Sequence, residues 1–171
     1  MIALAPVAHA DRAALLAFEL ANRAFFEANI NARAATYYSV DGVAQAIQAG
    51  IDDAAADRGY QFLVKSANGD ILGRINLRDV ARGHSPSATL GYRIGEAHGG
   101  QGHASAAVRA LLDIAFGELG LLRIAASARV SNLGSVRVLQ RTGFDEVGVA
   151  ARSFQLAGVW HDKLLFERHA S

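Results

Sequence analysis

A cluster of glycines is the clearest chemical feature of the sequence. Gly99, Gly100 and Gly102 lie between an apolar segment, TLGYRI at 89–94, and a helical pattern that begins at His103. The first turn of a helix presents backbone N–H groups without intrahelical partners, at the positive end of the helix dipole. Because glycine has no side chain, an anion can approach those amides closely. The cluster indicates either a phosphate or pyrophosphate site or simply a tight turn between a strand and a helix.

The residues around the glycines do not fit the two common nucleotide motifs. A P-loop needs Lys and then Ser or Thr after the last glycine, but His103 stands there. A dinucleotide-binding turn needs a third small residue, which Ser105 misses narrowly, and an acidic residue about 20 positions later. The next predicted strand leads into Arg129 without a carboxylate. A nucleotide fold of either kind is therefore not predicted.

Asn132 and Ser135 are candidate polar residues at the start of a later helix. They are one helical turn apart, so their side chains point to the same side. Either they contact a ligand, or Asn132 is the N-cap and Ser135 a small residue of the first turn. The chain contains no cysteine, which excludes a Cys-acyl intermediate, and it contains no G-x-S-x-G elbow.

No single residue is identified as a general base. Five side chains are conceivable: Glu19, Glu27, His84, Glu96 and His98. An N-terminal α-amine, with a pKa of about 7.7–8.0, is neutral often enough to react without such a base. His98 and His103 face different directions around the glycine turn, so no metal site is predicted.

Four segments resemble motifs of the GNAT superfamily of N-acyltransferases. GGQGHA (99–104) resembles its Gln/Arg-x-x-Gly-x-Gly/Ala turn, and NLGSVRVLQRTGF (132–144) resembles its N-x-x-S…G-F signature. NRAFFE (22–27) and AGVWHD (157–162) resemble segments of the RimJ/RimL-type branch, which acetylates the N-termini of ribosomal proteins. Two positions depart from the pattern: Gly99 replaces Gln or Arg, and Thr89 replaces a frequent Glu.

The resemblance implies acetyl-coenzyme A as the donor, a primary amine as the acceptor, and no metal. The donor's pantetheine is expected to pair with strand 89–94 like an extra strand. The implied donor-binding residues are Tyr92, Ile94, Gly99, Gly100, Gln101, Gly102, His103, Ala104, Ser105, Asn132 and Ser135. The backbone amide of Ile94 is a candidate oxyanion donor if the splayed end of its strand leaves amides free, and ordinary strand pairing is the alternative. Ser135 is expected to pass a proton to the leaving sulfur through water.

The acceptor site is implied to lie between the aromatic stretch 25–39 and the final hairpin. Its implied residues are Phe26, Glu27, Tyr38, Trp160 and Asp162, with Glu27 also a candidate catalytic group. Core packing alone would equally explain Phe26 and Trp160. The leading function is direct transfer of acetyl to the N-terminal α-amine of a protein, such as a ribosomal protein, in a ternary complex. The alternatives are acetylation of a small amine (a polyamine, amino acid or antibiotic) and non-catalytic binding of acyl-CoA.

The apolar periodicity predicts the elements that position these groups. Helices are expected from a cap at Asp11 to Ala24, over 42–56 with a cap at Asp41, over 103–119, and from Ser131 or Asn132 to Gly143. Strands are expected at 2–5, 61–65, 71–79, 89–94, 121–128, 144–149 and 159–167. This order predicts an α/β fold with a mixed sheet. The resemblance implies the GNAT fold, whose mostly antiparallel sheet is splayed between its fourth and fifth strands and flanked by about four helices.

Composition limits the class of protein. The chain has 171 residues, 51% of them hydrophobic, and a formal net charge of +1. We expect one domain over 1–171, with no electrostatic case for a nucleic-acid or membrane partner. The sequence has no signal-peptide pattern and no uncharged apolar run of about 18 residues. A cytoplasmic location is expected, and the oligomeric state is left open, with a homodimer among the options.

Overall fold

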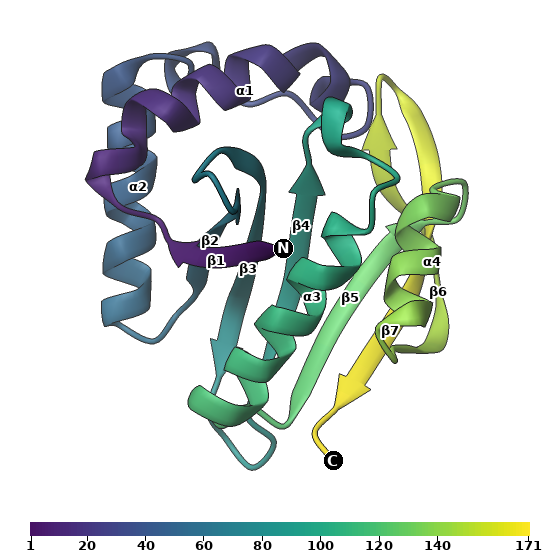
Figure 1. The fold of residues 1–171 in the computed structure, drawn as a ribbon. Helices are drawn as coiled ribbons and strands as arrows, with labels where there is room; N and C mark the ends of the chain where they lie inside the picture. Colours follow the sequence, from purple (N-terminus) through teal and green to yellow (C-terminus); the bar gives the residue numbers. More distant parts are fainter.

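The computed structural model describes residues 1–171 and is built on a sheet of seven strands in the order β1-β2-β3-β4-β5-β7-β6 (Figure 1). Only β4 and β5 pair in parallel; all other neighbours are antiparallel. The strands are β1 (Ile2–Pro6), β2 (Tyr60–Ser66), β3 (Ile71–Ala81), β4 (Ser87–Ile94), β5 (Arg123–Arg129), β6 (Asp145–Leu156) and β7 (Val159–His169).

Helices cover both faces of the sheet. They are α1 (Arg12–Glu27), α2 (Val40–Ala55), α3 (His103–Asp113) and α4 (Leu133–Arg141), with short turns η1 (His9–Asp11), η2 (Ala35–Tyr37), η3 (Glu96–His98) and η4 (Ile114–Glu118). Successive residues of a strand point to opposite faces. Leu63 of β2 therefore packs with α1 and α2, whereas its neighbours Phe62 and Val64 pack with α3. Figure 1 looks onto the face that carries α3 and α4.

The sheet is splayed between β4 and β5, as expected. Their ladder contains three residue pairs, from Ser87 with Arg123 to Thr89 with Ala125, and then stops. Beyond Thr89, β4 continues alone to Ile94 on that side, while β5 continues to Arg129 beside β7. The mixed, mostly antiparallel sheet and its flanking helices confirm the predicted fold class.

Two predicted helix caps are wrong because other side chains compete for the position. Asp11 has helical backbone angles and makes no cap; its carboxylate instead pairs with Lys65 Nζ at 2.7 Å. Ser39, not Asp41, caps α2, since its backbone is extended and its Oγ accepts from the amide of Gly42 at 3.0 Å. An N-cap needs an extended backbone that aims the side chain back at the first turn.

Several predicted boundaries also move. α1 extends past Ala24, so Phe26 and Glu27 are helical rather than part of an irregular stretch. The helix predicted over 103–119 ends as α-helix at Asp113 and continues as a π-turn. β6 extends beyond 149 to Leu156, because a bulge between Ala150 and Phe154 interrupts the alternation that a sequence pattern relies on.

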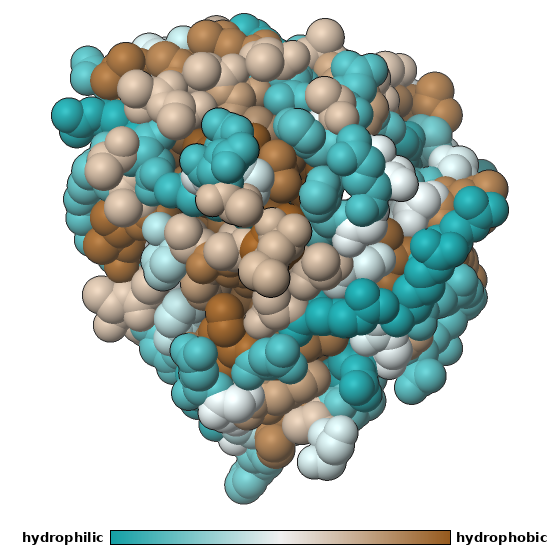
Figure 2. All heavy atoms as spheres, in the orientation of Figure 1, coloured by the Kyte–Doolittle hydropathy of each residue, from teal (hydrophilic) through white to brown (hydrophobic).

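No helix is both long and apolar enough to cross a membrane. On the face drawn in Figure 2, hydrophobic residues lie in separate small groups among hydrophilic ones.

Candidate active site

The open end of β4 leaves backbone amides without a strand partner. The amide of Gly95 donates to Leu72 O at 2.8 Å, across to β3. Amides of an antiparallel strand point alternately to its two sides, so the amide of Ile94 points to the other side, away from β3. Since the β4–β5 ladder ends at Thr89, this amide faces the gap between the two strands. The amide of Ile94 can thus donate to a ligand that lies in this gap.

A hydrogen bond crosses from β4 to α4. The hydroxyl of Tyr92 lies 2.9 Å from Oγ of Ser135, and either group could donate. Burial raises the pKa of Tyr92, and the hydrogen bond to Ser135 offsets part of that rise. The phenol therefore stays protonated at physiological pH and is available as a donor. Sequence reasoning named both residues but expected water, rather than Tyr92, next to Ser135.

Asn132 acts as the N-cap of α4. Its Oδ1 accepts from the amide of Ser135 at 3.2 Å, and the residue is otherwise exposed. Asn132 is thus the helix cap that the sequence offered as one of two interpretations. Its side chain also fixes the first turn of α4, which presents Ser135. Gly143 follows α4 with φ +84°, the left-handed conformation expected of a glycine that ends a helix.

The glycine turn joins η3 to the N-terminus of α3. Gly100 has φ +71° and Gly102 has φ +83°, so both need the conformational freedom of glycine, whereas Gly99 at φ −67° does not. Nothing lies within 4 Å of the position that a Cβ would take at Gly100 or Gly102. No side chain caps α3, so the amides that follow Gly102 remain open to a ligand. An anion fits this turn.

The remaining residues of the motif differ in exposure. Gln101 is exposed and its Nε2 donates to Ala97 O at 3.1 Å. His103 and Ala104 are half-buried, and Ser105 is buried in the first turn of α3. The rings of His98 and His103 are 6.4 Å apart and edge-on to each other.

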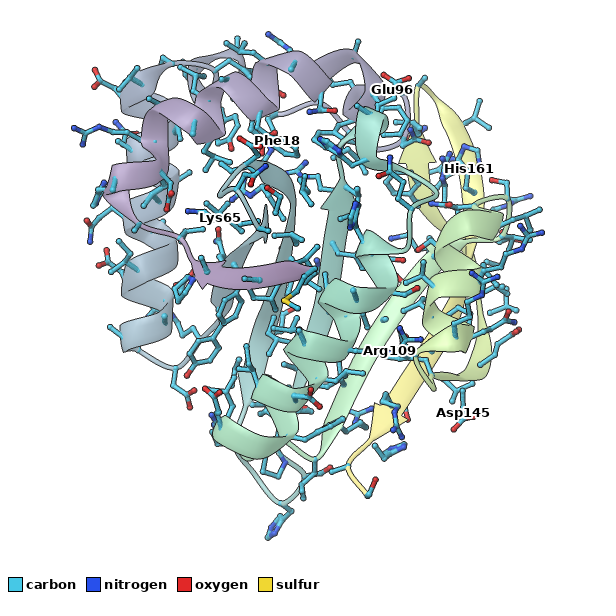
Figure 3. The ribbon with its side chains drawn as sticks, viewed as in Figure 1. Phe18, Lys65, Glu96, Arg109, Asp145 and His161 are labelled. Carbon is cyan, nitrogen blue, oxygen red and sulfur yellow. The ribbon has the colours of Figure 1, made fainter.

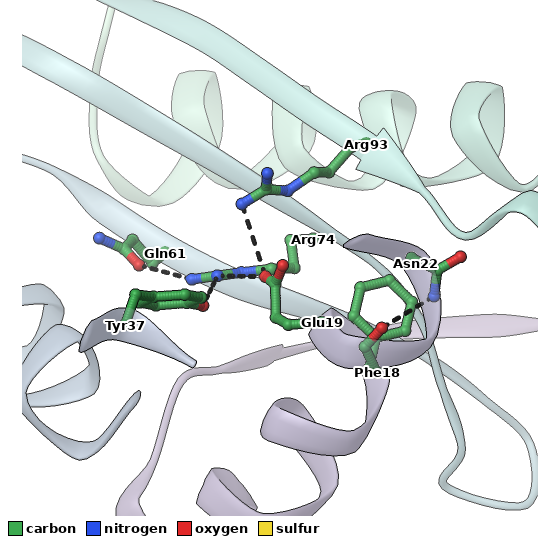
Figure 4. A network of polar contacts seen from close by, with 7 residues as sticks. All are labelled: Phe18, Glu19, Asn22, Tyr37, Gln61, Arg74 and Arg93. Atoms are coloured by element: carbon green, nitrogen blue, oxygen red, sulfur yellow. Dashed lines mark hydrogen bonds and ion pairs between the residues drawn. The ribbon is translucent and has the colours of Figure 1, made fainter. Parts of the chain in front are cut away.

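A buried charge network lies under α1 (Figure 4). The carboxylate of Glu19, which is 1% exposed, accepts from Arg74 at 2.7 Å and lies 3.5 Å from Arg93. Arg74 also donates to the hydroxyl of Tyr37 at 2.9 Å and to Gln61 at 3.2 Å. Glu19 is therefore held by two guanidiniums and is not free to act as a general base.

Sequence reasoning missed both arginines of this network. One signal points to the network: Glu19 lies one helical turn from Leu15 on the buried side of α1. Arg74 gives no such signal, because it alternates with Ile75 and Leu77 as an ordinary polar position of the strand. A carboxylate on a buried face needs a partner, and a strand arginine facing the same way can supply it.

The acceptor residues implied by α1 and the following segment cluster through aromatic and cationic contacts. Phe26 is buried, and the guanidinium of Arg93 lies 5.0 Å from its ring centre. Glu27 is paired with Arg23 at 2.9 Å, and the same arginine lies 4.0 Å from the ring centre of Tyr38. Glu27 is thus a charge partner of Arg23 rather than an isolated carboxylate.

Trp160 and Asp162 lie on the β6–β7 hairpin, beside a shallow cleft of about 330 Å³. Trp160 is 56% exposed, so it is not the core residue that packing alone would require. Asp162 Oδ1 accepts from the amide of Arg152 at 2.8 Å, which fixes the hairpin. Figure 3 shows His161 on this hairpin, close to the N-terminal end of α4.

A hydrogen bond of 3.2 Å, from Arg129 Nη2 to Oδ1 of Asn29, links the end of α1 to β5. It brings the end of α1 to the strand that pairs with β7, the second strand of the hairpin.

The other conceivable bases lie away from the Tyr92–Ser135 pair. His84 is exposed in the β3–β4 loop, at the opposite end of β4 from Ile94. Glu96 and His98 line a cleft of about 510 Å³ between α1, η3 and the β2–β3 turn, to which Tyr92 and Ser135 contribute nothing. In Figure 3, Glu96 lies just beyond the end of β4, under α1.

Comparisons with known proteins agree with this geometry. The sequence model of a family described as acetyltransferase (GNAT) domain matches residues 2–145. YjcK of Bacillus subtilis, described as a probable N-acetyltransferase, is 37% identical over 158 residues, which cover 92% of this chain and 87% of YjcK.

Two solved structures share the fold over nearly the whole chain. Ribosomal-protein-S5-alanine acetyltransferase from Vibrio fischeri superposes with a TM-score of 0.93 at 21% identity, covering 98% of this chain and 92% of its own. RimJ of Mycobacterium smegmatis, in complex with CoA-disulfide, superposes with a TM-score of 0.90 at 28% identity, covering 99% of this chain and 82% of its own.

Proposed function

The chain belongs to the GNAT acetyltransferase family and is an N-acetyltransferase, and we propose that it transfers acetyl from acetyl-CoA to the N-terminal α-amine of a protein. The family uses acetyl-CoA as its donor. The observation that carries the proposal is the hydrogen bond between Tyr92 and Ser135, next to unpaired amides of β4. The two hydroxyls provide a proton donor, and the unpaired amides provide hydrogen-bond donors, beside the same gap between β4 and β5.

In this proposal the glycine turn holds the pyrophosphate of the donor. The amides that follow Gly102 face it, and the missing side chains of Gly100 and Gly102 leave room for phosphate oxygens. Gly99 contributes only backbone. The rest of the turn consists of Gln101, His103, Ala104 and Ser105. The N-terminal end of α4, with its cap Asn132, borders the pantetheine.

The chain's own groups assist the transfer at two atoms. The amide of Ile94 donates to the thioester oxygen, which gains negative charge as the amine nitrogen bonds to the carbonyl carbon. Ser135 donates a proton to the sulfur as the carbon–sulfur bond breaks, and Tyr92 replaces that proton through the 2.9 Å contact. The amine loses one proton to solvent and solvent returns one proton to Tyr92, so the products are the amide and the free thiol, and the protein is restored.

Two observations support a protein N-terminus as the acceptor. The cleft beside Trp160 and Asp162 is shallow and open, which suits the end of a polypeptide chain better than an enclosed small molecule. The Vibrio fischeri structure with the same fold is named as an acetyltransferase of an alanine of ribosomal protein S5. Phe26, Glu27 and Tyr38 form the opposite wall in this proposal.

Thiol release tests the proposal directly. Acetyl-CoA is incubated with the protein and, in turn, with an N-terminal peptide, the same peptide with a blocked α-amine and a free lysine, spermidine, and an aminoglycoside. We expect release with the free α-amine and little with the blocked peptide. Release with spermidine or the aminoglycoside alone would contradict the acceptor assignment, and binding of acetyl-CoA without release from any amine would contradict the catalytic one.

A further inference from the structure

Cationic side chains from four strands lie on one face of the sheet across its splayed region. Residues directly opposite each other in a ladder share a face, as do alternate residues of one strand. On β3, Arg74 and Arg78 share a face, and their partners on β4 are Arg93 and Thr89. Thr89 in turn pairs with Ala125 of β5. Ala125 shares its face with Arg129, which pairs with Lys163. We call Arg78, Arg93, Arg129 and Lys163 the cationic face.

The cationic face borders one wall of the proposed acceptor site, the wall that contains Phe26. It lies on the side of the sheet that α1 occupies, because Arg74 on that side contacts Glu19 of α1. Arg93 lies 5.0 Å from the ring centre of Phe26. A Cβ built on Gly91, the residue before Tyr92, would lie 3.1 Å from Nη1 of Arg78. Two of the four cations thus lie against residues of β4 or of the proposed acceptor wall.

These cations are poorly neutralised by the chain itself. Arg93 shares one carboxylate, Glu19, with Arg74 and lies 0.8 Å farther from it (3.5 Å against 2.7 Å). The side chain of Arg129 has only the neutral amide of Asn29 as a hydrogen-bond partner, at 3.2 Å. Arg78 contacts Asp79 at 3.7 Å, and both side chains are mostly exposed.

Lys163 has no ion pair, and its ammonium lies 5.0 Å from the ring centre of Phe154. Its pKa is lowered by burial and by the charge of Arg78. The nearest carboxylate that shares this face on β7, Glu167, is already paired with Arg123 at 2.7 Å. At Thr89, a position on this face, no acidic side chain is present either.

We propose that the cationic face binds carboxylates of the acceptor, so that the preferred substrate is a protein N-terminus followed closely by Asp or Glu. This proposal rests on the proposed function and specifies its substrate class. Strands are about 4.8 Å apart, so the four strands β3, β4, β5 and β7 span at least about 14 Å. That length matches four to five residues of an extended peptide at about 3.3 Å each.

The same positive charges disfavour a polyamine as the acceptor. A polyamine carries several ammonium groups, and like charges close together are repelled. Nearby cations also favour the neutral form of an amine, so they lower the pKa of an α-amine that binds among them. A cationic face therefore supplies part of what a missing general base would supply, without any proton acceptor on the chain.

The test uses three peptides that share an Ala-Gly start and an amidated C-terminus, and carry Glu, Gln or Lys at positions three to five. We expect kcat/KM for the Glu peptide to exceed that for the Gln peptide by at least about fivefold, with the Lys peptide lower still. The difference should shrink as salt is raised, because salt screens exposed charges.

Two variants assign the preference to the cationic face. Arg78→Gln should reduce the Glu-to-Gln ratio at least about twofold, and Arg78→Glu should favour the Lys peptide over the Glu peptide. Arg78 is suited to this because its side chain is 59% exposed and its substitution leaves the core intact. Arg12→Gln is the matched control: Arg12 is exposed at the far end of α1, and its removal should change no ratio.

The outcomes separate this proposal from the one on which it rests. If no peptide is acetylated, the assignment of a protein N-terminus as acceptor fails, and this inference fails with it. If all three peptides react equally, the acceptor assignment stands and the inference is overturned. A short RNA provides a further test. The inference is also overturned if the RNA inhibits acetylation of the Glu, Gln and Lys peptides equally and kcat/KM for the Glu peptide does not exceed that for the Gln peptide, because the cations would then bind a nucleic acid.

Discussion

Ser135 alone is a weak acid, and the structure identifies the group that can assist it. A serine hydroxyl gives up a proton reluctantly, so transfer to a leaving sulfur needs a second donor behind it. The phenol of Tyr92 lies 2.9 Å away, and its burial raises its pKa above the usual value of about 10. At neutral pH the phenol is protonated, and it can refill the serine as the serine donates.

We expect Ser135→Ala to lower kcat by about 10² or less, with a smaller effect on KM for acetyl-CoA. A group that acts on the departing sulfur contributes mainly in the transition state. Tyr92→Phe should lower kcat by a smaller factor, because Ser135 can still receive a proton from water. Steady-state kinetics with saturating amine give both values. An unchanged kcat in Ser135→Ala would contradict a catalytic role and indicate that this residue is only structural.

Glu19 is expected to stabilise the fold rather than abstract a proton. It is 1% exposed and is the shared carboxylate of Arg74 and Arg93. Glu19→Ala leaves two guanidiniums without their counter-charge, so the free energy of unfolding should fall by about 3–5 kcal/mol. Urea denaturation measures this loss.

The matched substitution for this prediction is Glu19→Gln, which keeps the shape and part of the hydrogen bonding. It should fold, with a smaller loss of stability, and should keep most of its kcat. A stable Glu19→Gln protein with kcat lowered by 10² or more would identify Glu19 as the general base after all.

At the scale of elements, the turn between β4 and α3 has a backbone conformation that depends on glycine. Gly102 adopts φ +83° and is followed by uncapped amides at the start of α3. A side chain there is strained in any case, and its Cβ enters space that no chain atom fills. The turn is shaped for something outside the chain.

Gly102→Val should therefore weaken acetyl-CoA binding by at least about tenfold, or about 1.4 kcal/mol. The left-handed conformation should also cost about 1–2 kcal/mol of stability, which leaves the apo protein folded. Calorimetric titration and circular dichroism measure the two effects.

Gly99→Ala is the control, because Gly99 has φ −67° and ψ 151°, which any residue adopts. Its affinity for acetyl-CoA should stay within about twofold of the parent. The reverse order, with Gly99→Ala impaired and Gly102→Val unaffected, would show that the motif is aligned wrongly to residues 99–104.

At the scale of the whole molecule, the donor would lie between parts of the sheet that barely contact one another. Only three residue pairs join β4 to β5, and the contact between Arg129 and Asn29 bridges the end of α1 to β5. A ligand in the gap adds contacts to both sides at once. Binding should therefore stabilise the entire fold and not just the turn.

We expect acetyl-CoA at 100 times its Kd to stabilise the protein by about 2.7 kcal/mol. For a chain of this length that corresponds to an increase in Tm of about 5–10 °C. Thermal unfolding followed at several ligand concentrations gives the dependence. Gly102→Val should require a higher concentration for the same shift. A Tm that is independent of acetyl-CoA would argue against donor binding in the gap.

Features that depend on neighbouring residues could be predicted from the sequence by itself. The glycine turn, the Asn132 cap, the Gly143 terminator and the order of helices and strands follow from backbone preferences over a few residues. The motifs at 99–104 and 132–144 carried enough local information to suggest the family and the fold. The predicted cap at Asp11 is wrong because its carboxylate pairs with the distant Lys65, and the one at Asp41 is wrong because Ser39, two residues earlier, takes the cap position.

Contacts between distant segments were decided only by the tertiary structure. Tyr92 and Ser135 are 43 residues apart, Glu19 and Arg74 are 55 apart, and Asn29 and Arg129 are 100 apart. Each contact depends on strand register and on how a helix lies across the sheet, and a shift of one residue in a strand would turn its side chain to the opposite face. The cationic face arises in the same way, because its members come from four strands whose shared side is set by pairing alone.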